Sequence, residues 1–117
     1  EDTRNLITRR ELEMMKSGSY LINMARGHIV NEEDLLKALE SGHLAGAAID
    51  AFSVEPPKDL RLVQHPRVLS TPHIAGLGFQ ARKSMCRIAS QQVAMTLKGS
   101  RPTFAVNDPV KPRNIRK

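Results

Sequence analysis

The chain contains one cysteine, no tryptophan, one tyrosine and three phenylalanines in 117 residues. A single cysteine cannot close an internal disulfide, and Cys86 lies in a helical pattern without a metal-ligand spacing, so we expect a buried thiol. The 3% aromatic content beside 40% hydrophobic residues predicts one modest domain with a core of small aliphatic side chains. No apolar run has membrane-spanning length and no secretory signal is present. The chain begins with Glu1, and we interpret it as a cytoplasmic fragment without a membrane partner.

The net charge of +6 is concentrated at one end of the chain. Residues 101–117 contain five basic residues and one acidic residue, which places +4 of the +6 there. A basic tail raises the alternative of nucleic-acid binding, but no aromatic platform or base-reading motif accompanies it. We therefore predict no nucleic-acid partner. The three prolines and low apolar content of this segment predict an extended tail.

Helical and strand-like segments alternate along the rest of the chain. Helices are predicted over Thr8–Lys16, from Asn31 to Gly42 and over Phe79–Lys98. Short strands are predicted over Tyr20–Met24, Leu44–Asp50 and Val68–Thr71. This alternation predicts an α/β fold with a parallel sheet. In the longest helix the apolar spacing predicts a packed face, formed by Ala81, Met85, Ile88, Ala89, Val93 and Leu97.

Chemically distinctive side chains follow each predicted strand. Tyr20–Ile22 has the composition of a buried strand and leads to Arg26; the second strand ends at Asp50, with Glu55 in the following proline-containing loop; the third leads to His73. Because the carboxyl ends of parallel strands share one edge of a sheet, these four residues can converge. Structural alternatives stay open: a salt bridge for Arg26, a turn cap for Asp50, a solvated Glu55 and a core hydrogen-bonding His73.

Three motifs carry a family resemblance. Asn23-Met-Ala-Arg-Gly27, then Gly46-Ala-Ala-Ile-Asp-Ala-Phe52 with Glu55-Pro56, then Thr71-Pro-His-Ile-Ala-Gly76 resemble the D-isomer-specific 2-hydroxyacid dehydrogenase family in order and approximate spacing. The likeness extends from about Asp2 to Asn107. It implies that residues 1–76 form the C-terminal half of a Rossmann-like nucleotide-binding domain. Residues 77–117 would be a crossing helix and tail that return to the substrate domain.

The resemblance also implies site roles and a reaction. Arg26 would bind the substrate carboxylate, His73 would exchange the hydroxyl proton and Glu55 would pair with His73. The expected cofactor, NAD or NADP, would contact a set of side-chain and backbone groups: Met24, Ala25, Arg26, Asp50, His73, Ile74, Ala75 and Gly76. No metal is implied. The reaction would be hydride transfer between a D-2-hydroxy acid and its 2-keto acid, with reduction favoured at lower pH and oxidation at higher pH.

The residue chemistry fits these roles independently. A guanidinium holds a carboxylate by two parallel hydrogen bonds, and an imidazole exchanges protons near neutral pH. Gly27 and Gly76 are interpreted as turn residues. His28, His43 and His65 lie outside the motifs and are interpreted as structural.

The family's G-x-G-x-x-G dinucleotide fingerprint is absent, as is most of the substrate domain, so we expect the 117-residue chain alone to be inactive. The parent is expected to be a homodimer. The substrate stays open among glyoxylate, hydroxypyruvate, lactate and phosphoglycerate types. An alternative function is a nicotinamide-sensing binding protein, similar to corepressor relatives on the same fold.

Overall fold

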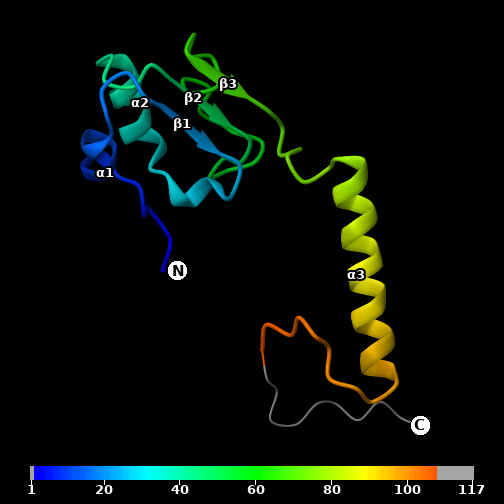
Figure 1. The fold of residues 1–117 in the computed structure, drawn as a ribbon. Helices are drawn as coiled ribbons and strands as arrows, with labels where there is room; N and C mark the ends of the chain where they lie inside the picture. The colour runs from blue at the N-terminus through cyan, green and yellow to red at the C-terminus, as the bar shows by residue number, and fades with distance from the viewer. Residues whose placement is uncertain (1, 108–117) are drawn as a thin grey trace. The chain divides into compact units, whose positions relative to one another are not determined.

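The computed structural model describes residues 2–107, and the chain divides into two compact units between Ala75 and Gly76. The first unit contains two α-helices, a short 3₁₀ turn and three strands (Figure 1). Their order is α1 (Arg9–Met14), β1 (Tyr20–Asn23), η1 (Gly27–Ile29), α2 (Glu32–Glu40), β2 (Gly46–Ile49) and β3 (Val68–Ser70). The three strands are parallel in the order β1-β2-β3. The predicted α/β fold with a parallel sheet is confirmed, and the strands are one to three residues shorter than predicted.

Local sequence signals explain where the two helices begin and end. The Glu11 carboxylate accepts hydrogen bonds from the backbone N–H (3.0 Å) and hydroxyl (2.7 Å) of Thr8, which secures the start of α1. The Asn31 side chain accepts from the Asp34 N–H at 3.0 Å and caps α2. Gly18 and Gly42, which follow the two helices, each have φ of +79°. Glycine adopts this left-handed conformation without a side-chain clash, so the chain can turn back into a strand.

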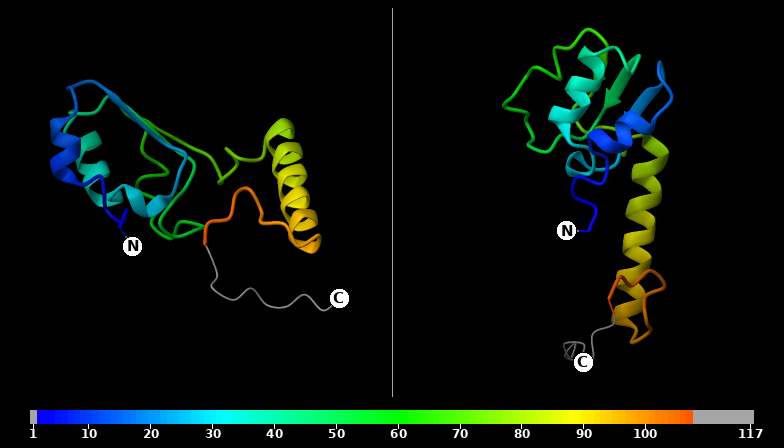
Figure 2. Two further views of the ribbon diagram at one scale, coloured as in Figure 1. Left: turned by 60° about the horizontal axis from the view of Figure 1, so that its bottom comes forward. Right: turned by 90° about the vertical axis from the view of Figure 1, so that its left-hand side faces the viewer.

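Both helices cover the same face of the sheet (Figures 1 and 2). The core between them is built from buried aliphatic residues, which include Leu12 of α1, Leu35, Leu36 and Leu39 of α2, and Ala47 and Ile49 of β2. The opposite face carries Tyr20, Ile22 and Leu69, which are 70%, 66% and 68% exposed. The prediction that Tyr20–Ile22 is a buried strand is therefore wrong for this face. No described residue of the first unit covers it, although the apolar composition matches a sheet covered on both sides.

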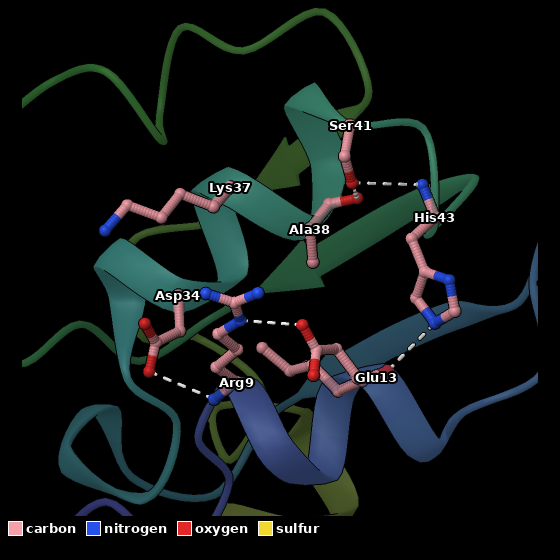
Figure 3. Close-up of a pocket in the computed structure, with 8 residues that line it drawn as sticks. Arg9, Glu13, Asp34, Lys37, Ala38, Ser41 and His43 are labelled. Atoms are coloured by element: carbon pink, nitrogen blue, oxygen red, sulfur yellow. Dashed lines mark hydrogen bonds and ion pairs between the residues drawn. The ribbon is translucent and has the colours of Figure 1, made fainter.

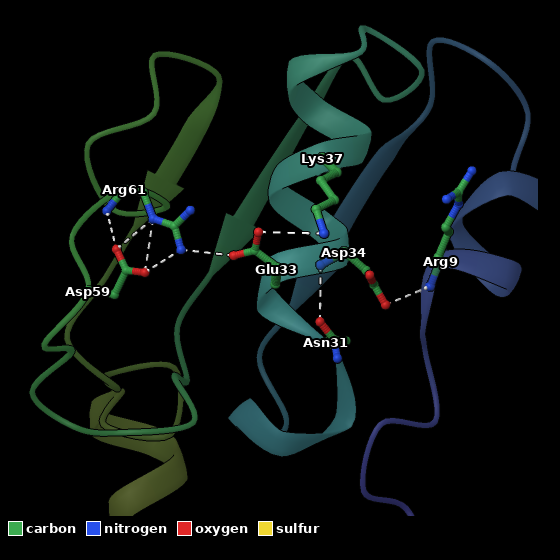
Figure 4. Close-up of polar contacts among 7 residues, drawn as sticks. All are labelled: Arg9, Asn31, Glu33, Asp34, Lys37, Asp59 and Arg61. Carbon is green, nitrogen blue, oxygen red and sulfur yellow. Dashed lines mark hydrogen bonds and ion pairs between the residues drawn. The ribbon is translucent and has the colours of Figure 1, made fainter.

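The loop between β2 and β3 is attached to the first turn of α2. The Glu32 carboxylate accepts a hydrogen bond from the Ser53 N–H at 2.6 Å. Farther along the loop, Arg61 pairs with Glu33 at 2.8 Å and with Asp59 at 2.7 Å (Figure 4). Such exposed ion pairs contribute little stability individually, but here they join elements distant in sequence. The loop that carries Glu55 is therefore held against α2 at two points.

Gly27 has the least room for a side chain among the glycines of the first unit. A Cβ atom on this residue would lie 2.0 Å from the Phe52 carbonyl carbon and 2.2 Å from the Ser53 nitrogen. Gly27 opens the 3₁₀ turn, as interpreted from the sequence. Its φ is not positive, so the requirement for glycine here is close backbone approach, which the sequence did not indicate. The chain segment after Arg26 therefore packs directly on the segment that leads to Glu55.

Gly27→Ala is accordingly expected to destabilise the first unit by about 2 to 3 kcal/mol, because backbone atoms must move to admit the methyl group. Urea unfolding of the 117-residue chain measures this change. Gly76→Ala is the matched control, since a Cβ there meets nothing within 4 Å. The control is expected to alter the free energy of unfolding by less than about 0.5 kcal/mol. Equal stability of the two variants would contradict the close packing at Gly27.

The second unit contains α3 (Phe79–Leu97), which ends where Gly99 adopts φ of +78°. Two contacts bring residues 103–104 beside its last turns: the Thr103 hydroxyl lies 3.8 Å from the Met95 sulfur, and the Phe104 N–H donates to the Gln92 side chain at 3.1 Å. Residues 101–107 contain no helix or strand, whereas the remainder of the predicted extended tail lies outside the described residues. No helix among residues 2–107 is long and apolar enough to span a membrane.

Two predictions about α3 are wrong within this unit. The apolar spacing predicted a packed face, but no residue of α3 is buried. Cys86 was predicted to be a buried thiol and is exposed. The reason is that residues 76–107 supply a single helix with no second layer to cover its apolar residues.

Candidate functional site

The predicted site residues lie beyond the carboxyl ends of the three strands. Asn23 and Ile49 are paired in the parallel register, and so are Ile49 and Ser70. The segments that lead to Arg26, Asp50 and His73 therefore leave the sheet at the same edge. Open α/β sheets bind their ligands at this edge.

The side chains of Glu55 and His73 are in direct contact within the candidate site. The His73 Nδ1 atom lies 2.8 Å and 3.0 Å from the two oxygens of the Glu55 carboxylate. Glu55 Oε1 also accepts the Phe52 N–H at 3.0 Å. The hydrogen bond from His73, followed by that from Phe52, lowers the pKa of the Glu55 carboxyl below its ordinary value. With Nδ1–H donating to this carboxylate, the Nε2 atom of His73 is left to exchange a proton with another molecule.

Asp50 holds the turn that presents His73. Its side chain is only 4% exposed. One carboxylate oxygen accepts from the Thr71 hydroxyl and from the Ile74 N–H at 2.8 Å, and the other accepts from the Ala75 N–H at 2.9 Å. The Thr71 hydroxyl, and then the two backbone amides, lower the pKa of the Asp50 carboxyl. Asp50 is therefore a charged anchor for the turn.

This anchoring supports an uncommon backbone conformation at His73, which has φ of +54°. Positive φ is uncommon outside glycine, although asparagine, aspartate and histidine adopt it more often than other residues. The His73 N–H donates to the backbone carbonyl of Asp50 at 2.9 Å and to that of Thr71 at 3.0 Å. The carboxylate bonds on either side of His73 thus fix a strained residue in place, as is frequent at functional sites.

Arg26 lies in the neighbouring loop after β1. Its Nη1 atom donates to the Ala25 carbonyl at 2.7 Å, and the residue is exposed. Among residues 2–107, no direct hydrogen bond joins Arg26 to the Glu55–His73 pair. The two loops are instead connected through the backbone, because the Asp50 N–H donates to the Asn23 carbonyl at 2.9 Å.

The structure adds three residues to the predicted set: Asn23, Thr71 and Glu32. Asn23 accepts from the Ala25 N–H and donates to the Arg26 carbonyl, both at 3.1 Å. Thr71 binds Asp50, and Glu32 anchors the loop that carries Glu55. A polar residue that ends an apolar run is a recognisable signal for a turn, and could have identified Asn23 and Thr71. Glu32 had no comparable signal, since an acidic residue at a helix start already has a local explanation.

One cavity lies at the site edge of the sheet, and another lies between the two helices of the first unit. A cavity of about 450 Å³ has a largely apolar lining, including Phe52, Pro56 and Pro72, and reaches Asp50, Glu55 and His73. A second, of about 360 Å³, lies between α1 and α2 (Figure 3). Its charged groups bind one another: Arg9 Nε pairs with Glu13 at 2.6 Å, and the Arg9 N–H donates to Asp34 at 3.0 Å. The first cavity contains predicted site residues and the second contains none.

The residues present fit only part of a dinucleotide. The sequence has one G-x-G segment, Gly76-Leu-Gly78, where neither glycine has a positive φ and a Cβ would meet open space. The glycines of a phosphate-binding fingerprint are needed for a tight turn and a close approach, which this segment does not show. The sheet edge, with its backbone groups and apolar cavity, suits the nicotinamide end. Among residues 2–107, no cluster of His, Cys, Asp and Glu is arranged to bind a metal.

Fold and site together define part of a nicotinamide-nucleotide-binding α/β domain. Residues 1–75 match the family model described as D-isomer specific 2-hydroxyacid dehydrogenase, NAD binding domain. The chain therefore belongs to the D-isomer-specific 2-hydroxyacid dehydrogenase family, and the resemblance inferred from the motifs is confirmed.

Similar proteins include curated enzymes and solved structures. The chain is 42% identical over 109 residues to D-3-phosphoglycerate dehydrogenase of Bacillus subtilis, covering 93% of this chain and 21% of that protein. It is 41% identical over 111 residues to glyoxylate reductase of Thermofilum pendens, covering 94% and 33%. The crystal structure of a D-isomer specific 2-hydroxyacid dehydrogenase from Xanthobacter autotrophicus in complex with NADPH and MES has a TM-score of 0.79 at 33% identity, covering 91% and 43%. The chain thus spans about a fifth to a third of these two curated relatives.

The Glu55–His73 contact makes stability depend on pH. The pKa of the Glu55 carboxyl is lowered in the folded state. Its contribution to the free energy of unfolding is therefore fully present above the ordinary pKa of a glutamate and is lost as pH falls through the lowered value. Wild type is therefore expected to lose more stability than Glu55→Gln between neutral pH and about pH 3, measured by urea unfolding of the chain. Glu40→Gln, which changes an exposed residue of α2, is the control and should follow wild type. Parallel curves for wild type and Glu55→Gln would show that the pair has no pH-linked contribution.

Proposed function

We propose that this chain supplies the proton-transfer and carboxylate-binding groups of a nicotinamide-dependent 2-hydroxyacid dehydrogenase. The observation that carries the proposal is the His73 Nδ1–Glu55 contact of 2.8 Å at the carboxyl edge of a parallel sheet. It leaves Nε2 of His73 for a substrate oxygen, while Arg26 stands in the adjacent loop. The relatives named above are a phosphoglycerate dehydrogenase and a glyoxylate reductase.

Arg26, His73 and Glu55 have separate roles in the proposed reaction. Arg26 binds the carboxylate of the 2-keto acid by two hydrogen bonds and sets the orientation of its C2 carbonyl. His73 Nε2 donates a proton to the carbonyl oxygen during reduction and removes it during oxidation. Glu55 accepts the hydrogen bond from Nδ1 and holds the ring so that Nε2 faces the substrate. When bound, the nicotinamide ring supplies or accepts the hydride at C2.

Proton balance gives the direction of the pH effect. Reduction consumes a proton and therefore requires His73 to be protonated, whereas oxidation requires it to be neutral. Keto-acid reduction is favoured at lower pH and hydroxy-acid oxidation at higher pH. The cofactor is NAD or NADP, since the sequence lacks the fingerprint segment that carries the acidic or basic residue selecting between them.

A panel assay tests the proposal. The full-length protein that contains this chain is mixed with NADH or NADPH and with glyoxylate, hydroxypyruvate, pyruvate or 3-phosphohydroxypyruvate, and absorbance of the reduced cofactor is followed. Turnover of at least one 2-keto acid is expected. The 117-residue chain is assayed in parallel and is expected to be inactive, since it lacks a dinucleotide fingerprint. Full-length protein that binds the cofactor but reduces none of these acids would contradict the proposal. The cytoplasmic location and the homodimeric parent stay predictions.

A further inference from the structure

We propose that Asn23 is a positioning residue for Arg26. Its side-chain amide holds the turn from Ala25 to Arg26 in the form that presents the guanidinium to a substrate carboxylate. This inference rests on the proposed function, because it assigns Asn23 an effect that operates through Arg26.

The amide of Asn23 uses both of its polar ends on this turn. Oδ1 accepts from the Ala25 N–H and Nδ2 donates to the Arg26 carbonyl, each at 3.1 Å. The residue is 6% exposed, so water competes little for these hydrogen bonds. A side chain in this position must accept at one atom and donate at another. Asparagine meets both requirements, whereas an ionised aspartate only accepts.

The backbone conformation of the turn sets the position of the Arg26 guanidinium. The guanidinium Nη1 donates to the Ala25 carbonyl at 2.7 Å, so the side chain folds against the same turn that Asn23 braces. Movement of the Arg26 carbonyl away from Asn23 would displace the guanidinium with it. An arginine that binds a carboxylate with two bonds tolerates little displacement, since both bonds must align.

Asn23 also connects the Arg26 loop to the turn that carries His73. Its backbone carbonyl accepts the Asp50 N–H at 2.9 Å, and the Asp50 carboxylate holds the residues around His73. Asn23 and Asp50 are the buried polar residues of the described chain; Asn23 ends β1, and Asp50 directly follows the neighbouring strand β2. The backbone contact sets the spacing between the loops, while the Asn23 amide acts on the Arg26 loop alone.

Asn23→Asp tests this role with little change in shape. Oxamate, a carboxylate with an adjacent carbonyl, is titrated into the full-length protein with reduced cofactor present, and its Kd is measured by calorimetry. We expect the Kd for oxamate to rise about tenfold, because loss of one hydrogen bond and a carboxylate facing the Arg26 carbonyl disturb the turn. The KM for the cofactor is expected to change less than about twofold.

Asn31→Asp is the matched control. The Asn31 side chain acts as an acceptor for the Asp34 N–H, and aspartate accepts equally well at a helix start. This variant should bind oxamate as wild type does. A double-mutant cycle with Arg26→Lys identifies the route of the effect, since two residues that act through one contact give less than additive losses.

The results distinguish a failure of the Asn23 positioning role from a failure of the proposed function. A Kd for oxamate that is unchanged in Asn23→Asp, or losses that add fully to those of Arg26→Lys, would overturn the positioning role even if the wild type is an active dehydrogenase. A weakened and non-additive Kd in a protein that reduces no 2-keto acid would support the role of Asn23 and contradict the proposed function. Wild type that binds no oxamate would overturn both.

Discussion

Replacement of His73 by asparagine is expected to lower kcat for 2-keto acid reduction by about 10²- to 10⁴-fold, because the variant lacks the group that transfers the proton. Asparagine is the appropriate substitution, since His73 has φ of +54° and asparagine tolerates this left-handed region better than most residues. The backbone bonds from the turn to Asp50 can then persist. Steady-state kinetics of the full-length protein measure the effect, and the KM for the keto acid should change less than about threefold.

His65→Asn is the matched control for this experiment. The His65 Nδ1 atom accepts the Arg67 N–H at 3.2 Å ahead of β3, and the asparagine side-chain oxygen can accept the same bond. This variant should keep wild-type kcat. If His73→Asn also keeps wild-type kcat while its fold is intact, His73 is not the proton-transfer group and the Glu55–His73 pair is structural.

Sequence periodicity was sufficient to predict the sheet and the helices that cover it. Alternating helical and strand-like segments with Asn31 as a cap gave the correct order, and the leucines of α2 are buried as their spacing indicates. These signals are local, because caps and apolar spacing act within one or two helical turns. Element ends were less accurate. Leu44 and Ala45, for example, precede β2 although they continue its apolar run.

Burial was harder to predict, because it depends on which layers are present. Ile22 and Leu69 lie on either side of Ala48 in the register and form an apolar face that no described residue of the first unit covers. The apolar residues of α3 are likewise exposed in their own unit. Composition indicates that a surface is suited to packing, whereas only neighbouring elements determine whether it is covered.

The candidate site shows the same division between local and long-range information. The strand pattern placed Arg26, Glu55 and His73 at one edge of the sheet. The family resemblance implied the pairing of Glu55 with His73, and the two side chains are in contact in the structure. The sequence did not indicate that both Asp50 oxygens are engaged by the turn around His73. It also did not indicate that Gly27 packs on Phe52. Both depend on contacts between segments separated by more than twenty residues, which no spacing rule contains.

Arg26→Ala is expected to lower kcat/KM for a 2-keto acid by about a thousandfold, since it removes two hydrogen bonds between charged groups, each worth about 1.5 to 3 kcal/mol. Arg26→Lys should retain part of the activity, because the ammonium keeps the positive charge but cannot form the two parallel bonds. Both kcat and KM are expected to change, as the clamp acts in binding and in orientation of the carbonyl. The cofactor KM provides an internal reference.

Arg10→Ala controls for the loss of a surface cation. Arg10 lies on α1, its side chain is 84% exposed and it pairs with Glu11 at 3.2 Å, so its removal should leave kcat/KM unchanged. A substrate-analogue comparison adds a second criterion: an aldehyde without a carboxylate should be reduced equally poorly by wild type and Arg26→Ala. If Arg26→Ala has wild-type kinetics with the keto acid, the carboxylate is bound elsewhere. The Asn23 contacts would then stabilise a turn without a part in substrate recognition.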